Sequence, residues 1–132
     1  MKKILVVLSV LITVAAFSSC EINTARSGKV DYSYGFSKVN SGDLSEMSAI
    51  QDAYTTEFKK ISGATMENGR AHVVMEGVYS DTDKSIKKAC ADAEKVLKDK
   101  NFTSYFQFHI TATYYEDARV DEDFYYKDYG KE

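Results

Sequence analysis

The dipeptide Asn68-Gly69 is the feature that most constrains the fold of this chain. Both residues tolerate the positive φ angles of a two-residue type I′ turn, and such turns join antiparallel strands. Apolar residues alternate with others on either side of the pair, over residues 64–67 and 70–79. The sequence therefore predicts a hairpin in which residues 64–67 pair with residues 70–73.

The longer strand of this hairpin has two distinguishable faces, because side chains alternate between the two sides of a strand. One face carries Ala71, Val73, Met75 and Tyr79, and the other carries His72, Val74, Glu76 and Val78. The first set is the more apolar, which predicts that it packs against the core.

Two further segments alternate in the same way. In residues 30–37 the apolar positions are Val30, Tyr32, Tyr34 and Phe36. In residues 103–115 they are Phe106, Phe108, Ile110, Ala112 and Tyr114, which alternate with Tyr105, Gln107, His109, Thr111, Thr113 and Tyr115. Each pattern is typical of a half-buried strand.

Two segments carry apolar residues at helical spacing. The first follows Asp43 and Glu46, a capping-box-like start, and is expected to end at Gly63. The second is expected to begin with Asp81 or Thr82 as its N-cap and to end near Lys100. Their apolar stripes are Leu44, Met47, Ile50, Tyr54, Phe58 and Ile61 in the first helix, and Ile86, Ala89, Cys90, Ala93, Val96 and Leu97 in the second.

The order of these elements predicts an α+β domain. It is strand, helix, strand, strand, helix, strand, which is the βαββαβ order of the ferredoxin-like arrangement. Right-handed crossovers would place both helices on one face of a four-stranded antiparallel sheet, in the spatial order fourth, first, third, second. The alternative is a three-stranded parallel βαβαβ layer in which residues 62–69 form a plain loop.

The first residues of the chain predict export. Lys2 and Lys3 precede an apolar stretch over residues 4–17. As a helix this stretch would be about 21 Å long, which is short of the roughly 30 Å hydrocarbon core of a bilayer. A basic start, a short apolar segment and small residues before a cleavage point are typical of a secretory signal peptide.

The end of this segment, Phe17, Ser18, Ser19 and Cys20, resembles the lipobox of bacterial lipoproteins. The resemblance covers the first 20 residues only, and Phe17 departs from the leucine that is commonest at its position. It implies that the lipoprotein signal peptidase recognises the three residues before Cys20, cleaves there, and leaves a triacylated cysteine in the lipid bilayer. Two or more acyl chains give stable membrane anchoring.

The resemblance also implies that the mature protein is located in the cell envelope. Because Glu21 is not the aspartate that resembles an inner-membrane retention signal, we expect delivery to the outer membrane. The sequence does not distinguish between the periplasmic face and the surface face of that membrane. With the signal peptide at residues 1–19, the rest divides into the lipidated Cys20 with its tether (residues 20–28), an α+β domain (residues 29–116) and a C-terminal tail (residues 117–132).

The tail combines acidic residues with four aromatic ones, Phe124, Tyr125, Tyr126 and Tyr129. It is either a flexible acidic extension or a segment that folds back onto the open face or the edge of the sheet.

Charge and motifs argue against several functions. The 20 acidic residues outnumber the 17 basic ones, which argues against nucleic-acid binding, since phosphate neutralisation requires a basic surface. The sequence has no nucleophile elbow, glycine-rich phosphate loop or metal-binding helix motif, so we expect no enzymatic activity, no cofactor and no metal. Cys90 lies on an apolar stripe and is expected to be a buried thiol.

The sheet face turned away from the helices is the candidate working surface. It would combine both histidines with apolar and aromatic side chains, more than a merely solvated face requires. Its candidate contact residues are Asp31, His72, Val74, Glu76, Val78, Tyr105 and His109. We expect a non-enzymatic module that binds a protein partner or a second copy of itself. The alternatives are a small-ligand or metal-binding module that uses His72, Glu76 and His109, and a solvated face of strand-forming residues without a partner.

Overall fold

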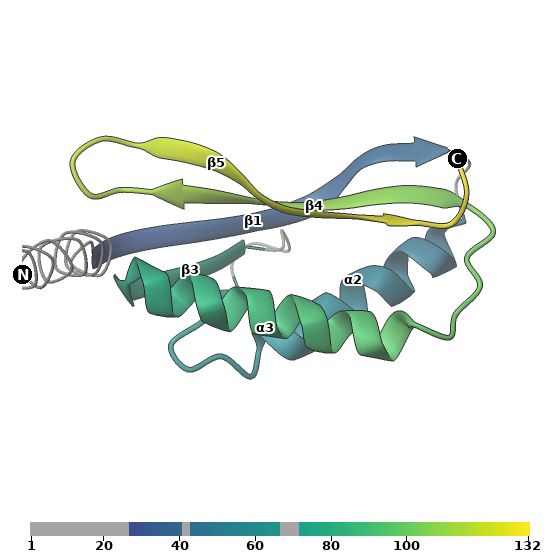
Figure 1. The fold of residues 1–132 in the computed structure, drawn as a ribbon, viewed down its shortest axis with the longest axis horizontal. Coiled ribbons are helices and arrows are strands. Elements are labelled where there is room, and N and C mark those ends of the chain that lie inside the picture. Colours follow the sequence, from purple (N-terminus) through teal and green to yellow (C-terminus); the bar gives the residue numbers. More distant parts are fainter. Residues whose placement is uncertain (1–26, 41–42, 67–71) are drawn as a thin grey trace, which may run out of the picture.

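A computed structural model describes residues 27–40, 43–66 and 72–132 of the chain. Two helices lie on one face of a five-stranded sheet whose strand order is β2-β3-β1-β4-β5 (Figure 1). The elements are β1 (Ser27–Asn40), α2 (Leu44–Phe58), β2 (Thr65–Met66), β3 (His72–Val78), α3 (Tyr79–Leu97), β4 (Tyr105–Tyr114) and β5 (Val120–Tyr129).

All neighbouring strands of this sheet are antiparallel. The predicted α+β class, the antiparallel sheet and the pair of helices are therefore confirmed, and the parallel βαβαβ alternative is wrong. The element order departs from the expected βαββαβ because a further strand, β5, follows β4.

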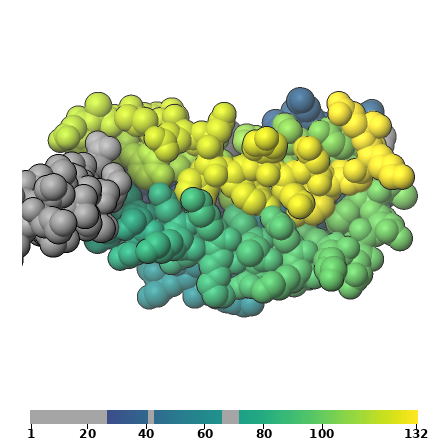
Figure 2. All heavy atoms as spheres, in the orientation of Figure 1, coloured from purple at the N-terminus to yellow at the C-terminus, as the bar shows by residue number. Residues whose placement is uncertain are grey.

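The fifth strand comes from the predicted tail. It pairs along the whole of β4, with Phe106 opposite Tyr129 and Ile110 opposite Tyr125, and a bulge interrupts the register near Phe124. Of the two alternatives for the tail, these residues therefore take the edge of the sheet and do not form a flexible extension. Figure 2 shows β5, in yellow, lying directly against the green and teal atoms of α3.

The predicted hairpin is present with a different register. Thr65 lies opposite Val74 and Met66 opposite Val73, which is two residues away from the pairing that a two-residue turn at Asn68-Gly69 would give. That turn lies outside the described residues. A shift of two residues leaves every side chain on its own face, so the hydrophobic pattern could not distinguish the two registers.

Helix α2 begins as expected and ends earlier. The Asp43 carboxylate accepts hydrogen bonds from the backbone N–H groups of Ser45 (2.9 Å) and Glu46 (3.4 Å), which caps the helix N-terminus. The helix stops at Phe58, before Gly63. Leu44, expected on the buried stripe, is the first residue of the helix and is 76% exposed.

Helix α3 begins two to three residues before its predicted caps. It starts at Tyr79 without a side-chain cap, so neither Asp81 nor Thr82 is the N-cap. Thr82 is buried instead, and its hydroxyl donates to the carbonyl oxygen of Tyr79 over 2.9 Å. Val96, near the other end, is 58% exposed and does not belong to the buried stripe.

The core lies between the sheet and the two helices, on the faces that alternation predicted. Its largest fully buried side chains are Tyr32, Tyr54, Phe58, Phe106, Phe108, Ile50, Ile86, Ile110, Val30, Val73 and Cys90. Tyr54 of α2 stacks on Phe108 of β4 with ring centroids 4.0 Å apart, which joins the helix layer to the centre of the sheet. In the described part of the chain, no helix is both long and apolar enough to cross a membrane.

Candidate functional site

The face of the sheet opposite the helices, which we call the open face, carries the predicted candidate residues. Among the described residues, no helix packs on it (Figure 1). Val74 and Val78 of β3 are half-buried, Glu76 is exposed, and Tyr126 of β5 is 67% exposed. Tyr105, in contrast, is buried, and its hydroxyl donates to the Asp128 carboxylate over 3.0 Å. It therefore offers little contact area to a partner.

The two histidines of this face lie on different sides of β1. His72 of β3 is opposite Ser33, and its Nδ1 lies 3.1 Å from an oxygen of Asp31. His109 of β4 is opposite Gly35, on the other side of the strand. Strand β1 thus separates the rings, as the sheet order requires. Within residues 27–40, 43–66 and 72–132, no group of three or more His, Cys, Asp or Glu side chains could hold a metal ion.

A hollow of about 340 Å³ surrounds His109 on the open face. Besides His109 it is lined by Ser37, Gln107, Asp123 and Tyr126, and residue 125 contributes to it. Gly35 lies beside His109 in the pairing of the strands, and a side chain there would meet no atom within 4 Å. The absence of a side chain at this position keeps that part of the face open.

The open face carries many carboxylates. They belong to Asp31, Glu76, Asp121, Asp123 and Asp128, as strand pairing places them beside residues of this face. Some are held by neighbours: Asp121 accepts hydrogen bonds from Thr113 (2.7 Å) and Arg119 (3.2 Å). The Lys29 ammonium lies 5.3 Å from the centre of the Tyr115 ring at one end of the face.

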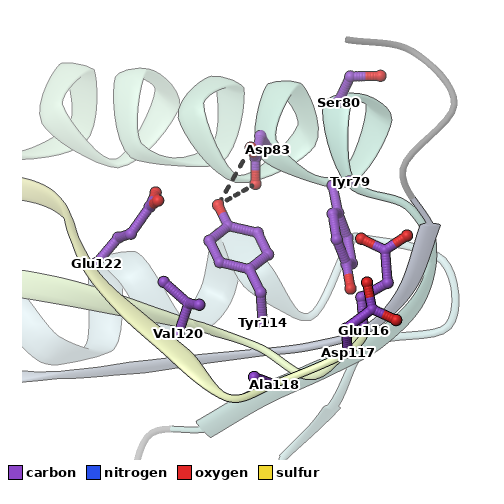
Figure 3. Close-up of a pocket in the computed structure, with 9 residues that line it drawn as sticks. All are labelled: Tyr79, Ser80, Asp83, Tyr114, Glu116, Asp117, Ala118, Val120 and Glu122. Carbon is purple, nitrogen blue, oxygen red and sulfur yellow. Dashed lines mark hydrogen bonds between the residues drawn. The ribbon is translucent and has the colours of Figure 1, made fainter. Parts of the chain in front are cut away.

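A second concavity, the hairpin pocket, lies between the start of α3 and the β4–β5 hairpin (Figure 3). It has a volume of about 350 Å³. Four carboxylates line it, those of Asp83, Glu116, Asp117 and Glu122, together with the rings of Tyr79 and Tyr114 and with Ser80, Ala118 and Val120. Its residues come from the start of α3 and from the β4–β5 hairpin, about 35 positions later in the chain, and the pairing of β5 with β4 adds Val120 and Glu122 to its wall.

Hydrogen bonds fix the inner wall of the hairpin pocket. The hydroxyl of Tyr114 donates to the Asp83 carboxylate, 3.2 Å and 3.3 Å from its two oxygens, and Tyr32 donates to the same carboxylate from the core. Burial, and after it the neighbouring Asp83 charge, raises the pKa of Tyr114 above its ordinary value. Tyr114 therefore stays protonated and continues to donate to Asp83.

Tyr79 is the unusual residue of this pocket. Its side chain is 8% exposed, and its hydroxyl is buried and has no hydrogen-bond partner among the described residues. The ring packs edge-on against Tyr114, with centroids 4.9 Å apart. Figure 3 shows it running from the start of α3, with its hydroxyl end toward the turn that holds Glu116 and Asp117.

Cys90 is the buried thiol that its position predicted. It is 1% exposed, and burial raises its pKa to about 12. A thiol in this environment is a poor nucleophile and a poor metal ligand, because both roles require the thiolate.

The predicted lipidation residues Phe17, Ser18, Ser19 and Cys20 lie outside the described residues. Sequence reasoning missed the hairpin pocket because the tail that forms one of its walls was left as either a flexible extension or a segment folded back onto the sheet, with no strand and no partner strand assigned to it. The sequence feature that could have revealed this strand is the set of aromatic residues Phe124, Tyr125 and Tyr129, whose spacing lets them reach the core.

Comparison with known proteins finds no matching family model, no curated relative and no similar solved structure.

Proposed function

We propose that this chain is a lipid-anchored, non-enzymatic binding module of the bacterial cell envelope, and that its open face binds a protein partner. The observation that carries the proposal is the asymmetry of the sheet. Both helices pack on one face, and within the described residues the opposite face has no such cover (Figure 1). A sheet face with exposed aromatic and half-buried aliphatic side chains has the mixed character of a protein contact surface.

The distribution of side chains suggests what kind of partner fits. Val74 and Val78 supply an apolar area on β3, and Tyr126 supplies an exposed ring on β5. Glu76 and Asp123 are exposed carboxylates beside them. A partner with an apolar centre and basic residues around it would match this pattern, since opposite charges at an interface favour encounter and fix orientation.

The anchor is the second part of the proposal. The resemblance of Phe17, Ser18, Ser19 and Cys20 to a lipobox supports attachment of acyl chains to Cys20. Such chains would hold the domain at the outer membrane, and the residues between Cys20 and β1 would serve as its tether. The partner is then a component of the same envelope compartment.

We also infer that β1, α2, β2, β3, α3 and β4 form a ferredoxin-like unit to which β5 is added. The strand order β2-β3-β1-β4 and the two helices on one face support this inference. The arrangement hosts many unrelated functions and selects none, so the function is argued from the surface alone.

Photo-cross-linking in intact envelopes tests the proposal. A photoreactive residue at Glu76, exposed on the open face, is compared with one at Val96, exposed on α3. We expect a discrete adduct from position 76 and none from position 96. An adduct of twice the chain's mass would identify the partner as a second copy. Absence of any discrete adduct from position 76, or equal adducts from both positions, would contradict a partner on the open face.

A second candidate function is small-ligand binding in the hollow around His109. The observation in its favour is that His109, Gln107 and Asp123 line one concavity. His109→Ala removes a lining side chain of the hollow without touching Val74 or Glu76, so it should weaken ligand binding there and leave cross-linking from position 76 intact. Loss of both would mean that the hollow and the contact surface are one site.

A further inference from the structure

We propose that a groove between the end of α3 and the end of β5 binds a ligand that carries two or more phosphate groups. We call it the lysine groove, because five lysines line it: Lys95, Lys98, Lys100, Lys127 and Lys131. The groove has a volume of about 1140 Å³, and Figure 1 shows the ends of α3 and β5 at the same end of the domain. The inference does not depend on the function proposed for the open face.

The lysine groove concentrates positive charge in a chain whose 20 acidic residues outnumber its 17 basic ones. All five lysines are exposed. Lys95 pairs with Asp92 over 3.2 Å, and Lys127 lies 3.9 Å from Glu94. The other three, Lys98, Lys100 and Lys131, form no ion pair with another described residue. Their ammonium groups are therefore available to an anion.

Other groups already engage the two carboxylates that line the groove. Asp128 accepts hydrogen bonds from the side chains of Tyr105 (3.0 Å) and Gln107 (3.2 Å), which belong to the open face. Glu94 accepts a hydrogen bond from the hydroxyl of Tyr125. These carboxylates are held by their own donors and leave the excess of positive charge in the groove in place.

The lysines come from both walls of the groove, which is the observation that points to a ligand. Lysines near the C-terminus of a helix interact favourably with the helix dipole, and this accounts for Lys95 and Lys98 without any ligand. It does not account for Lys127 and Lys131, which belong to β5 and to the segment after it. Like charges that face one another from two segments repel, and a bound anion would relieve this repulsion.

Packing sets the shape of the groove before any ligand arrives. The rings of Phe102 and Tyr129, which line it, pack edge-on with centroids 5.4 Å apart. Gly130 has a φ of +78°, and a side chain there would lie 2.0 Å from the carbonyl oxygen of Ser104. This close approach holds the two walls together. A preformed site binds a ligand without the cost of ordering its walls.

The side chains of the groove favour phosphate among anions. Lysine binds phosphate as a point charge with three N–H donors, so several ammonium groups can share the oxygens of one tetrahedral group. A planar carboxylate is recognised most specifically by the paired N–H groups of arginine, and none of the described residues that line the groove is an arginine. The volume is sufficient for a ligand with more than one phosphate.

The test is calorimetric titration of the full chain in detergent, at pH 7 and fixed ionic strength. The probes are inorganic tripolyphosphate, bis(glycerophospho)glycerol, which is a soluble lipid headgroup with two phosphates, and citrate as a carboxylate control. We expect saturable binding of at least one phosphate compound and weaker binding of citrate. Tighter binding of tripolyphosphate would identify a free phosphate ligand, and tighter binding of bis(glycerophospho)glycerol would identify a lipid headgroup. No saturable binding of either phosphate compound, or binding of citrate as tight as theirs, would overturn the proposal.

Matched variants place the binding in the lysine groove. The double variant Lys98→Gln/Lys131→Gln removes one exposed charge from each wall, so it should weaken phosphate affinity on the order of tenfold or more. The control, Lys59→Gln/Lys84→Gln, removes two charges from exposed or half-buried positions outside the groove. It should leave affinity unchanged. Equal weakening by both double variants would mean that the ligand responds to overall charge, and the proposal would fail.

Thermal unfolding separates a binding role from a structural one. Exposed lysines without ion pairs contribute little to stability, so Lys98→Gln/Lys131→Gln should melt within a few degrees of the wild type in the absence of ligand. Tripolyphosphate should raise the melting temperature of the wild type and have a smaller effect on the variant. An equal rise for both proteins would contradict binding in the lysine groove.

Discussion

The hydroxyl of Tyr54, on α2, lies 2.6 Å from the hydroxyl of Tyr129, the last residue of β5. Tyr54 also lies 2.9 Å from the hydroxyl of Tyr125, which in turn donates to the Glu94 carboxylate on α3. Burial raises the pKa of Tyr129 to about 12, so it remains protonated at neutral pH. The C-terminal strand is therefore tied to both helices and belongs to the core of the domain.

The first prediction concerns this strand. Tyr129→Ala removes a buried ring and should lower the free energy of unfolding by about 3–5 kcal/mol, as for other large-to-small core changes. Tyr126→Ala, in the same strand but 67% exposed, is the control and should cost about 0.5 kcal/mol or less. Urea unfolding of both variants measures the difference. Equal small costs would mean that the tail is only an extension.

The sequence predicted the three long strands that precede β5 well, because each has a clean alternation. Val30, Val73 and Ile110 lie on the core faces assigned to them. There is a physical reason why the sequence did not predict the two faces of β5. Its bulge near Phe124 breaks the alternation, and Glu122 and Lys127 occupy positions on the helix side. An edge strand with charges on both faces resembles a solvated tail in sequence.

The two candidate sites also differ in how far the sequence predicts them. The open face could be predicted from Val74, Glu76 and His109, because each follows from the alternation of a single strand. The hairpin pocket could not, since Tyr79 and Glu122 meet only through the pairing of β5 with β4 and the early start of α3. Tyr79 also lies close to Gly28, because β1 pairs with the end of β3 there, and a side chain at Gly28 would meet the Tyr79 hydroxyl at 2.8 Å.

The second prediction concerns the anchor. Cys20→Ala should abolish labelling of the protein with radioactive palmitate and should leave unprocessed precursor or soluble protein, because the acyl chains have no other attachment site in the proposal. Metabolic labelling and mass spectrometry measure both effects. Unchanged labelling with an intact mature mass would contradict the lipoprotein proposal.

The third prediction concerns Cys90. Its burial and its raised pKa, about 12, leave almost no accessible thiolate at pH 8. A thiol reagent should therefore modify Cys90 slowly in the native protein and rapidly in urea. Ile86→Ala, which opens the neighbouring core, should accelerate the reaction. Rapid modification of the native wild-type protein would show that the stripe of α3 is not buried.

The fourth prediction concerns acid stability. Glu46 of α2 accepts hydrogen bonds from the backbone N–H groups of Thr103 (2.8 Å) and Ser104 (2.9 Å), which precede β4. These bonds lower the pKa of Glu46 below its ordinary value of 4.5. A lowered folded-state pKa means that the stabilisation is present above pH 4.5 and is lost as the pH falls through the folded-state value.

Glu46→Gln should therefore be less stable than the wild type at pH 7 and lose this difference as the pH falls below 4.5. Thermal unfolding at pH 7, pH 5 and pH 3 follows the difference. Asp52→Asn, at an exposed position of the same helix, serves as the control for a change of net charge. A difference between Glu46→Gln and the wild type that does not depend on pH would show that the carboxylate charge has no such role.

The central claim is that the open face binds a protein partner, and Val74→Asp tests it most directly. Val74 is half-buried on that face, so the variant should keep the domain folded at a cost of about 1 kcal/mol, since surface strand positions tolerate such changes. An interface would have to bury the new charge without a partner, so the cross-link from position 76 should fall tenfold or more. Val96→Asp, on α3, should leave it unchanged. A folded Val74→Asp variant that cross-links as strongly as the wild type would contradict the claim.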